Sequence, residues 1–350
     1  MERMDQGMPF LLRYENVAWY ESGTVRILDR RCYPAELRYV ECGDYREVVR
    51  AIADMVTQSA GPYTAVGMGM ALAAFQCREK PAAEQREFLR RAADELAHAR
   101  PTTANRYGAI TNRCFRIAMS ALESGSDPVE EVRLDTIASL NRRYGTMQKV
   151  GDHLADLIPV GGAILTQCYG ETIIGAVIRA ARRQGKAFRV FCAETRPYLQ
   201  GARLTASCFA QSGFDTTVLT DNMAAYVLER EGVSLFTSAA DTIARDGRIA
   251  NKVGTFQLAI LAKYFGVPYF VTGIPDADKQ TGADIVIEQR DPDQVRFWHG
   301  VPNTVPEAKA IYPAFDVTPP HLISGVVTDR GVFTPYTLGR YFDGGEAAFY

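Results

Sequence analysis

The chain has 350 residues, 47% of them hydrophobic and 23% charged, and a formal net charge of -2 at pH 7. This balance is typical of a soluble enzyme, and it argues against a disordered chain, a polyanionic partner or a nucleic-acid-binding surface. The length exceeds what one hydrophobic core usually supports, so we expect two domains.

The first part of the chain predicts short strands followed by helices. Residues 15–42 alternate as strands with turns at Ser22-Gly23 and Pro34, which indicates a small β-meander. Apolar residues then recur at helical spacing over 45–57, 66–75, 82–97, 105–122 and 128–157. We therefore expect residues 1–158 to form a smaller, mostly helical domain that carries the meander.

The second part of the chain has a different texture. From Gly161 to Ile287, strand and helix patterns alternate with short connections, which predicts a doubly wound, Rossmann-like parallel sheet. Residues 159–350 are the expected catalytic domain, and the predicted fold class is α/β. Because no GxGxxG fingerprint with a later acidic residue follows a strand, we expect no nicotinamide or other cofactor.

The cysteine usage gives an expectation about metals and compartment. Seven cysteines are spread along the chain without a CxxC pair, and four histidines show no ligand spacing. We expect reduced thiols and no bound metal. Neither a basic, apolar leader nor an apolar stretch of membrane-spanning length is visible, so we predict a cytoplasmic protein without membrane contact.

Cys168 is the most informative single residue, because it lies between a strand and a helix. Residues 163–165 have the pattern of a buried strand, and residues 172–181 have helical spacing. Open α/β sheets bind ligands at the carboxyl ends of their strands. The positive end of the following helix is expected to lower the pKa of the thiol and favour thiolate. A buried structural cysteine is the alternative interpretation.

Polar clusters follow the next predicted strands in the same way. Residues 194–204 come after one apolar run, Asp221 after the next, and Asp241 after a third. Residues 251–255 then predict a helix start with an amide donor, a cation and free backbone amides, which together suit a phosphate. Taken alone, Asp241 is more consistent with a helix cap or turn residue, and Asp316 is equally consistent with a loop carboxylate that accepts backbone amides.

Taken in order, these motifs resemble the methylthioribose-1-phosphate isomerase family. That family is related to ribose-1,5-bisphosphate isomerases and to the regulatory subunits of translation initiation factor 2B. The resemblance runs from about Val17 to about Pro335, and the order and spacing of the motifs are more specific than any one of them. The matching segments are 28–34 (LDRRCYP), 100–105 (RPTTAN), Cys168, 194–205 (ETRPYLQGARLT), 221–225 (DNMAA), Asp241, 250–255 (ANKVGT) and 313–319 (PAFDVTP).

The resemblance implies an aldose-ketose isomerase of methionine salvage that works as a homodimer. Its default substrate is 5-methylthioribose 1-phosphate, with 5-deoxyribose 1-phosphate and ribose 1,5-bisphosphate as alternatives. A non-catalytic regulatory subunit like those of initiation factor 2B is the alternative class of protein. The residues at the family's functional positions are Cys168 and Asp241 for catalysis, and Arg100, Gln200, Asn251 and Lys252 for substrate and phosphate binding.

The implied substrate sets the chemistry. Its anomeric oxygen is esterified, so the sugar is locked as a ring. The reaction therefore needs an acid at the ring oxygen and a group that handles hydrogen between C2 and C1. We assign Asp241 to the first role and Cys168 to the second, with a hydride shift and an enediol both open. An apolar pocket around Asp241 would raise its pKa and keep it protonated near neutrality.

The sequence departs from the family pattern beside the inferred site. Gly61 stands where the phosphate arginine of the family's RGAPAIG segment would be, Tyr169 replaces an asparagine, and residues 239–242 read AADT instead of GADR. Because Gln200 and Asn251 are neutral donors, Arg100 and Lys252 should carry most of the charge compensation. We therefore favour a sugar with an uncharged C5 group.

Overall fold

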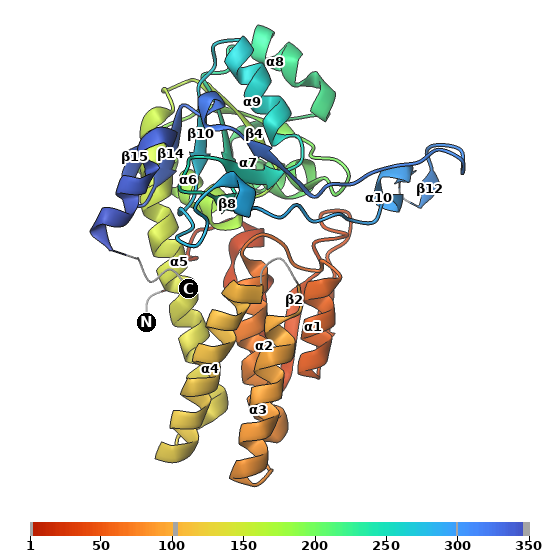
Figure 1. Ribbon diagram of the computed structural model, residues 1–350, viewed down its shortest axis with the longest axis vertical. Coiled ribbons are helices and arrows are strands. Elements are labelled where there is room, and N and C mark those ends of the chain that lie inside the picture. The colour runs from red at the N-terminus through yellow and green to blue at the C-terminus, as the bar shows by residue number, and fades with distance from the viewer. Residues whose placement is uncertain (1–2, 101–103, 299, 346–350) are drawn as a thin grey trace. The chain divides into compact units, whose positions relative to one another are not determined.

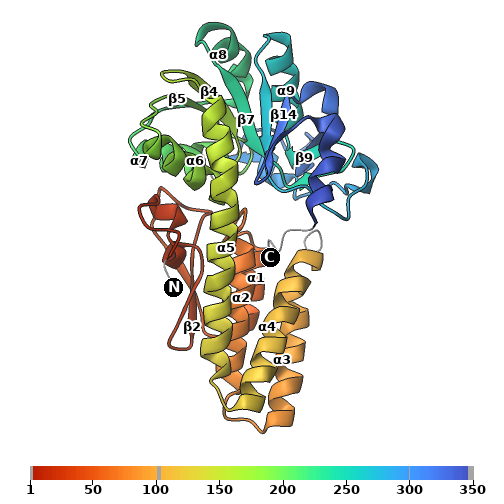
Figure 2. The ribbon, with the colours of Figure 1, turned by 90° about the vertical axis from the view of Figure 1, so that its left-hand side faces the viewer.

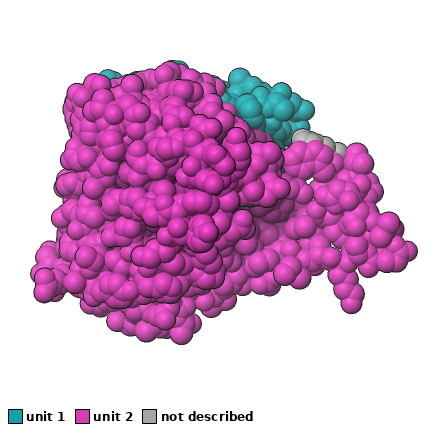
Figure 3. All heavy atoms as spheres, turned by 90° about the horizontal axis from the view of Figure 1, so that it is seen from above, with its two compact units in different colours: residues 1–145, 348–350 teal, residues 146–347 magenta. Residues whose placement is uncertain are grey.

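The computed structural model describes residues 3–100, 104–298 and 300–345 (Figure 1). The chain divides into two compact units, one that ends at Gly145 and one that begins at Thr146 (Figure 3). This division falls inside helix α5 (Pro128–Leu157), whereas the sequence places the domain boundary just after that helix. The boundary between residues 158 and 159 stays a prediction.

The first unit begins with the predicted meander. Two short 3-10 turns, η1 (Phe10–Leu12) and η2 (Tyr14–Asn16), precede an antiparallel sheet in the order β1-β2-β3. Its strands are β1 (Trp19–Glu21), β2 (Thr24–Leu28) and β3 (Tyr39–Cys42). Gly23 turns the chain between β1 and β2 with φ at 82°, and a Cβ there would lie 2.5 Å from the Phe75 ring. Only glycine fits this turn without a clash.

The rest of the first unit is helical, as predicted. Its helices are α1 (Tyr45–Ala53), α2 (Gly61–Cys77), α3 (Ala82–Ala97), α4 (Ala104–Ser124) and the first part of α5. Figure 2 shows α2, α3 and α4 side by side, with α2 in the core. Helix α2 starts five residues earlier than expected, because it is apolar on nearly every face and has no amphipathic period to mark its start.

The second unit contains the predicted doubly wound sheet. Its strands are β4 (Ala163–Gln167), β5 (Arg189–Ala193), β6 (Asp215–Leu219), β7 (Leu235–Ala239), β10 (Tyr269–Thr272), β14 (Gly325–Thr328) and β15 (Gly331–Phe333). They lie in the order β15-β14-β10-β7-β4-β5-β6, and all are parallel except β15 at the edge. The chain moves outward from β4 in one direction and later from β7 in the other. The topological switch point therefore lies between β4 and β7.

Helices cover both faces of this sheet. They are α6 (Glu171–Arg183), α7 (Ala206–Gln211), α8 (Ala224–Arg230) and α9 (Thr255–Tyr264), with a π-helical turn at Gly201–Thr205. Ile164 of β4 faces α6, whereas its neighbour Leu165 packs in the cluster that contains α8 and α9. A parallel sheet with helices on both faces confirms the predicted α/β fold class.

A second, smaller sheet was not predicted from the sequence. Strands β8 (Thr242–Ile243), β9 (Ile249–Lys252) and β13 (Phe315–Thr318) form an antiparallel sheet in the order β13-β9-β8. Asn251 and Lys252 therefore end a strand and do not start a helix, which corrects the expectation for residues 251–255. Gly254, with φ at 101°, breaks the chain between β9 and α9.

The segment of the chain between β10 and β13 contains short elements. They are η6 (Gly282–Asp284), α10 (Asp293–Arg296), and the hairpin of β11 (Phe297–Trp298) and β12 (Val301–Pro302). The turns η5 (Asp221–Met223), η7 (Pro320–Leu322) and η8 (Pro335–Gly344) complete the second unit. Figure 1 shows α10 and β12 extending away from the large sheet. Among the described residues, none of the helices has both the length and the apolar character that crossing a membrane requires.

Candidate active site

The two predicted catalytic residues lie at the switch point of the sheet. Cys168 directly follows β4, and Asp241 follows β7, the neighbouring parallel strand. The carboxyl ends of these strands lie at the same edge, and the two side chains are close enough for Asp241 to influence the thiol electrostatically. The geometry thus places both residues where doubly wound folds bind their ligands. Their chemical roles stay predictions.

The backbone at Cys168 is strained and firmly held. Its φ of 63° lies in the left-handed region, as does that of Thr195 at 65°, and such conformations cost about 1–3 kcal/mol each. The Cys168 amide donates to Thr195 Oγ1 at 2.9 Å, and the Cys168 carbonyl accepts from Thr205 Oγ1. The Asp221 carboxylate accepts from the Thr195 and Arg196 amides, both at 2.8 Å. A connected hydrogen-bond network therefore fixes the direction of the thiol.

The thiol of Cys168 is protonated at neutral pH. Burial raises its pKa to about 11, although Lys252 and Arg290 lower it, and the Asp241 charge raises it further. The expected thiolate is therefore wrong. The positive end of α6 favours thiolate, but removal of the thiol from solvent disfavours thiolate more strongly. Glu171 in the first turn of α6 also offsets the positive end of that helix.

Asp241 is exposed to solvent in the described chain. Its amide donates to the Ala250 carbonyl at 2.9 Å, which ties it to the small sheet. The apolar pocket expected around its carboxyl group is not present in the single chain. Asp241 is thus held at the backbone, while its side chain stays accessible.

Gln167, which the sequence analysis did not assign, joins the two sheets at the site. Its Nε2 donates to the carbonyls of Lys252 at 3.3 Å and Val253 at 3.1 Å. Its Oε1 accepts from Thr255 Oγ1 at 2.7 Å and from Asn251 Nδ2 at 3.4 Å. Asn251 Nδ2 also donates to Thr255 at 3.0 Å, so this predicted phosphate ligand braces the site. The one signal in the sequence was the position of Gln167 directly before Cys168.

Asp316 occupies the start of α9. Its carboxylate accepts from the amides of Gly254 at 2.7 Å and Phe256 at 3.1 Å. The expectation that free amides at this helix start would bind phosphate is therefore wrong for these two groups. Burial raises the pKa of Asp316 to about 6, even though the two amides and Lys252 stabilise its charged form.

Two buried cations lie beside Cys168. The ammonium of Lys252, a predicted phosphate ligand, lies 4.4 Å from the centroid of the Phe315 ring. Arg290 was missed, because it lies in a loop that matches no motif and carries only a short charged run. Its guanidinium carbon lies 5.9 Å from the Phe315 ring and 5.9 Å from the Tyr312 ring. Its Nε donates to Glu288 Oε1 at 3.1 Å.

Gln200 and Arg100 lie in different units. Gln200 is buried and directly precedes the π-helical turn, in which a Cβ on Gly201 would lie 1.8 Å from the Ala193 carbonyl oxygen. Glycine thus lets the turn approach the carboxyl end of β5, at the same edge as Cys168. Arg100 belongs to the first unit, in the bend after α3, and residues 101–103 of its motif lie outside the described residues. Phosphate binding by Gln200 and Arg100 stays a prediction.

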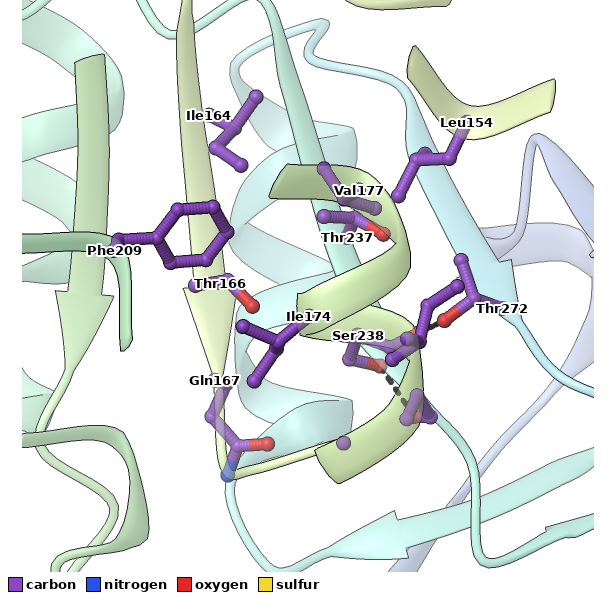
Figure 4. Close-up of a pocket in the computed structure, with 13 residues that line it drawn as sticks. Leu154, Ile164, Thr166, Gln167, Ile174, Val177, Phe209, Thr237, Ser238 and Thr272 are labelled. Atoms are coloured by element: carbon purple, nitrogen blue, oxygen red, sulfur yellow. Dashed lines mark hydrogen bonds between the residues drawn. The ribbon is translucent and has the colours of Figure 1, made fainter. Parts of the chain in front are cut away.

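A small cavity lies near this edge of the sheet. It lies under α6, next to Gln167 and Gly170, and has a volume of about 30 Å³ (Figure 4). Mostly apolar side chains line it, among them Ile164, Ile174 and Phe209. A space of this size is large enough for a water molecule. In the described part of the chain, no group of histidine, cysteine and acidic side chains is arranged to hold a metal ion.

Together, the strand order and the helices on both faces of the sheet define a Rossmann-like α/β protein, with the thiol and carboxylate at the switch point as its candidate site. Residues 60–335 match the initiation factor 2 subunit family, and the chain belongs to this family. It is 38% identical over 341 residues to the methylthioribose-1-phosphate isomerase of Geobacter metallireducens, which covers 92% of this chain and 96% of that protein. The isomerase of Chloroflexus aurantiacus is 36% identical, over 91% of this chain and 94% of its own.

Solved structures agree with this assignment. The 5-methylthioribose 1-phosphate isomerase from Pyrococcus horikoshii matches with a TM-score of 0.80 and 30% identity, over 95% of this chain and 97% of its own. The translation initiation factor eIF-2B subunit delta from A. fulgidus matches with a TM-score of 0.78 and 30% identity, over 91% and 96%. The predicted fold class and family resemblance are confirmed. Since proteins of both names share the fold, the function must be argued from the site.

Proposed function

We propose that this protein is an aldose-ketose isomerase that converts a 5-substituted ribose 1-phosphate, by default 5-methylthioribose 1-phosphate, into the ribulose 1-phosphate. The placement of Cys168 and Asp241 at the switch point carries this proposal. Relatives named as isomerases at 36–38% identity over most of the chain support it. The non-catalytic class is less favoured, because a regulatory subunit needs neither a positioned thiol nor an acid.

The reaction we propose needs no external reductant. Asp241 gives a proton to the ring oxygen as the bond from that oxygen to C1 breaks. The C2 hydrogen then moves to C1 with its electron pair, and the C2 hydroxyl loses its proton as the ketone forms, so Asp241 can regain a proton. The raised pKa of Cys168 favours this hydride route over an enediol, because a protonated thiol cannot remove a proton from C2. Cys168 keeps its own proton, and its sulfur accepts a hydrogen bond from the C2 hydroxyl while that hydroxyl gives its proton to the Asp241 carboxylate.

Incubation with three sugars tests the function. Purified protein is given 5-methylthioribose 1-phosphate, 5-deoxyribose 1-phosphate or ribose 1,5-bisphosphate, and the ketose product is followed by NMR. We expect turnover of a sugar with an uncharged C5 group. Turnover of the bisphosphate alone would make the substrate assignment wrong, and no turnover of any sugar by folded protein would favour the non-catalytic class.

We also propose a homodimer, built on the outer face of α9. Phe256, Ile260 and Tyr264 recur every four residues on this face and are 36%, 47% and 81% exposed. Tyr226 of the neighbouring α8 is exposed as well, and Figure 1 shows α8 and α9 side by side. An apolar stripe of this kind is typical of a helix that is covered in an assembly. Location in the cytoplasm and the absence of a nucleic-acid partner, which the net charge of -2 supports, are further proposals.

A further inference from the structure

The second unit supplies less phosphate-binding capacity than the motifs indicate. A phosphate dianion is held best by charged donors, above all by guanidinium and ammonium groups. The amide group of Asn251 is directed at Gln167 and Thr255, and two amides at the start of α9 are bonded to Asp316. Among the predicted phosphate ligands of this unit, Lys252 carries the only positive charge.

Arg290 places a second positive charge next to Lys252. Phe315 lies opposite Lys252 in the register between β13 and β9, and its ring is in contact range of both cations. The Arg290 side chain is 8% exposed, so its charge is largely removed from solvent. Glu288, 3.1 Å from Arg290 Nε, offsets part of the Arg290 charge, and a phosphate dianion would interact favourably with both cations at once.

The guanidinium of Arg290 is also held in a defined orientation. Its Nε donates to Glu288, its backbone amide donates to the Tyr312 carbonyl at 2.9 Å, and its plane lies near the Tyr312 ring. The bond to Glu288 uses Nε, and Tyr312 also interacts with the side chain. A guanidinium has five N–H donors, more than these two partners take up, so donors remain for phosphate oxygens. Because the group is already ordered, little side-chain entropy is lost when an anion binds.

We propose that Arg290 binds the phosphate of the sugar together with Lys252, and so supplies the positive charge that Gly61 lacks. This inference rests on the proposed function, since it names the phosphate subsite of the same site. It makes Arg290 a substrate-binding residue and leaves the acid-base chemistry to Asp241 and Cys168.

Titration with inorganic phosphate tests the inference without turnover. We would measure the Kd of phosphate by calorimetry for the wild type, Arg290→Gln, Arg290→Lys and Lys252→Met. Loss of a charged hydrogen-bonding partner should raise the Kd by about ten- to hundredfold in Arg290→Gln. Arg290→Lys should recover part of the affinity, because it keeps the charge and loses the fork. The matched control is Arg296→Gln, which removes an arginine bonded to Asp293 on α10 and should leave the Kd unchanged.

Each outcome decides the inference. A Kd for Arg290→Gln within about twofold of the wild type, below what one charged contact is worth, overturns it. A wild type that binds no phosphate at millimolar concentration overturns it too. The protein can also bind phosphate through Arg290 and yet isomerise none of the three sugars. That result supports the inference, while the proposed function fails. Circular dichroism checks folding, and if Arg290→Gln does not fold, Arg290→Lys decides in the same assay.

Discussion

Asp316 makes a quantitative prediction about the pH dependence of stability. Its pKa is about 6 in the folded chain against an ordinary value of 3.8, because burial disfavours the carboxylate. Each unit of pKa difference corresponds to about 1.4 kcal/mol. The protonated carboxyl group therefore adds about 3 kcal/mol to the free energy of unfolding. Since the folded pKa is raised, this contribution is fully present below pH 3.8 and is lost as the pH rises through 6.

The measurement compares the wild type with Asp316→Asn, which keeps the size and one acceptor but does not titrate. Urea unfolding of both proteins from pH 4 to 7 gives the difference in unfolding free energy at each pH. We expect the wild type to lose up to about 3 kcal/mol relative to the variant as the pH rises. Asp246→Asn is the control. Partial burial raises the pKa of Asp246, but bonds from Arg248 and Gly282 outweigh it and lower the pKa below its ordinary value. The contribution of Asp246 to the unfolding free energy is therefore lost only as the pH falls. A difference for Asp316→Asn that stays within about 0.5 kcal/mol from pH 4 to 7 would refute the reasoning.

Four further predictions concern the proposed site and dimer. Cys168→Ser and Asp241→Asn should each leave less than about a tenth of the wild-type kcat, given the usual size of acid-base contributions, and a folded variant with more would contradict the assigned role. In D₂O the ketose should carry no deuterium at C1, as NMR can check, because a hydride shift does not exchange with solvent; deuterium there would indicate an enediol. Thr195→Val should lower the unfolding free energy by about 1–3 kcal/mol in urea titration and reduce kcat, since the Cys168 amide loses its acceptor, while Thr195→Ser should restore both. Ile260→Asp should shift a dimer to monomer in sedimentation at micromolar concentration, and a wild type that sediments only as a 38.7 kDa particle would remove the dimer proposal.

The sequence predicted what depends on local patterns. Apolar runs and helical spacing, together with short connections, located four strands of the large sheet, β4, β5, β6 and β7. The polar residue after each strand then identified the carboxyl edge. Cys168 and Asp241 each follow such a strand, so the sequence alone assigns both to one edge of the sheet.

What the sequence did not predict depends on contacts between distant residues. Strand β9 pairs with β13 across more than sixty positions, and the short polar run at Asn251 and Lys252 has the same pattern as a helix start. Arg290 reaches the site from a loop, which carries no periodic signal. The pKa of Cys168 depends on how much solvent the folded chain removes, and that quantity is set only after packing.

Gln167 has a consequence for how this site can vary among related chains. It is one side chain, yet it fixes the end of the parallel sheet, which carries the thiol, to the end of the antiparallel sheet, which carries the lysine. The spacing of these two groups therefore does not depend on the hairpin that joins β8 to β9. We expect an insertion between Gln167 and Cys168 to separate the thiol from the lysine, because the bonds of Gln167 would still hold the end of β9 but no longer the residue next to Gln167.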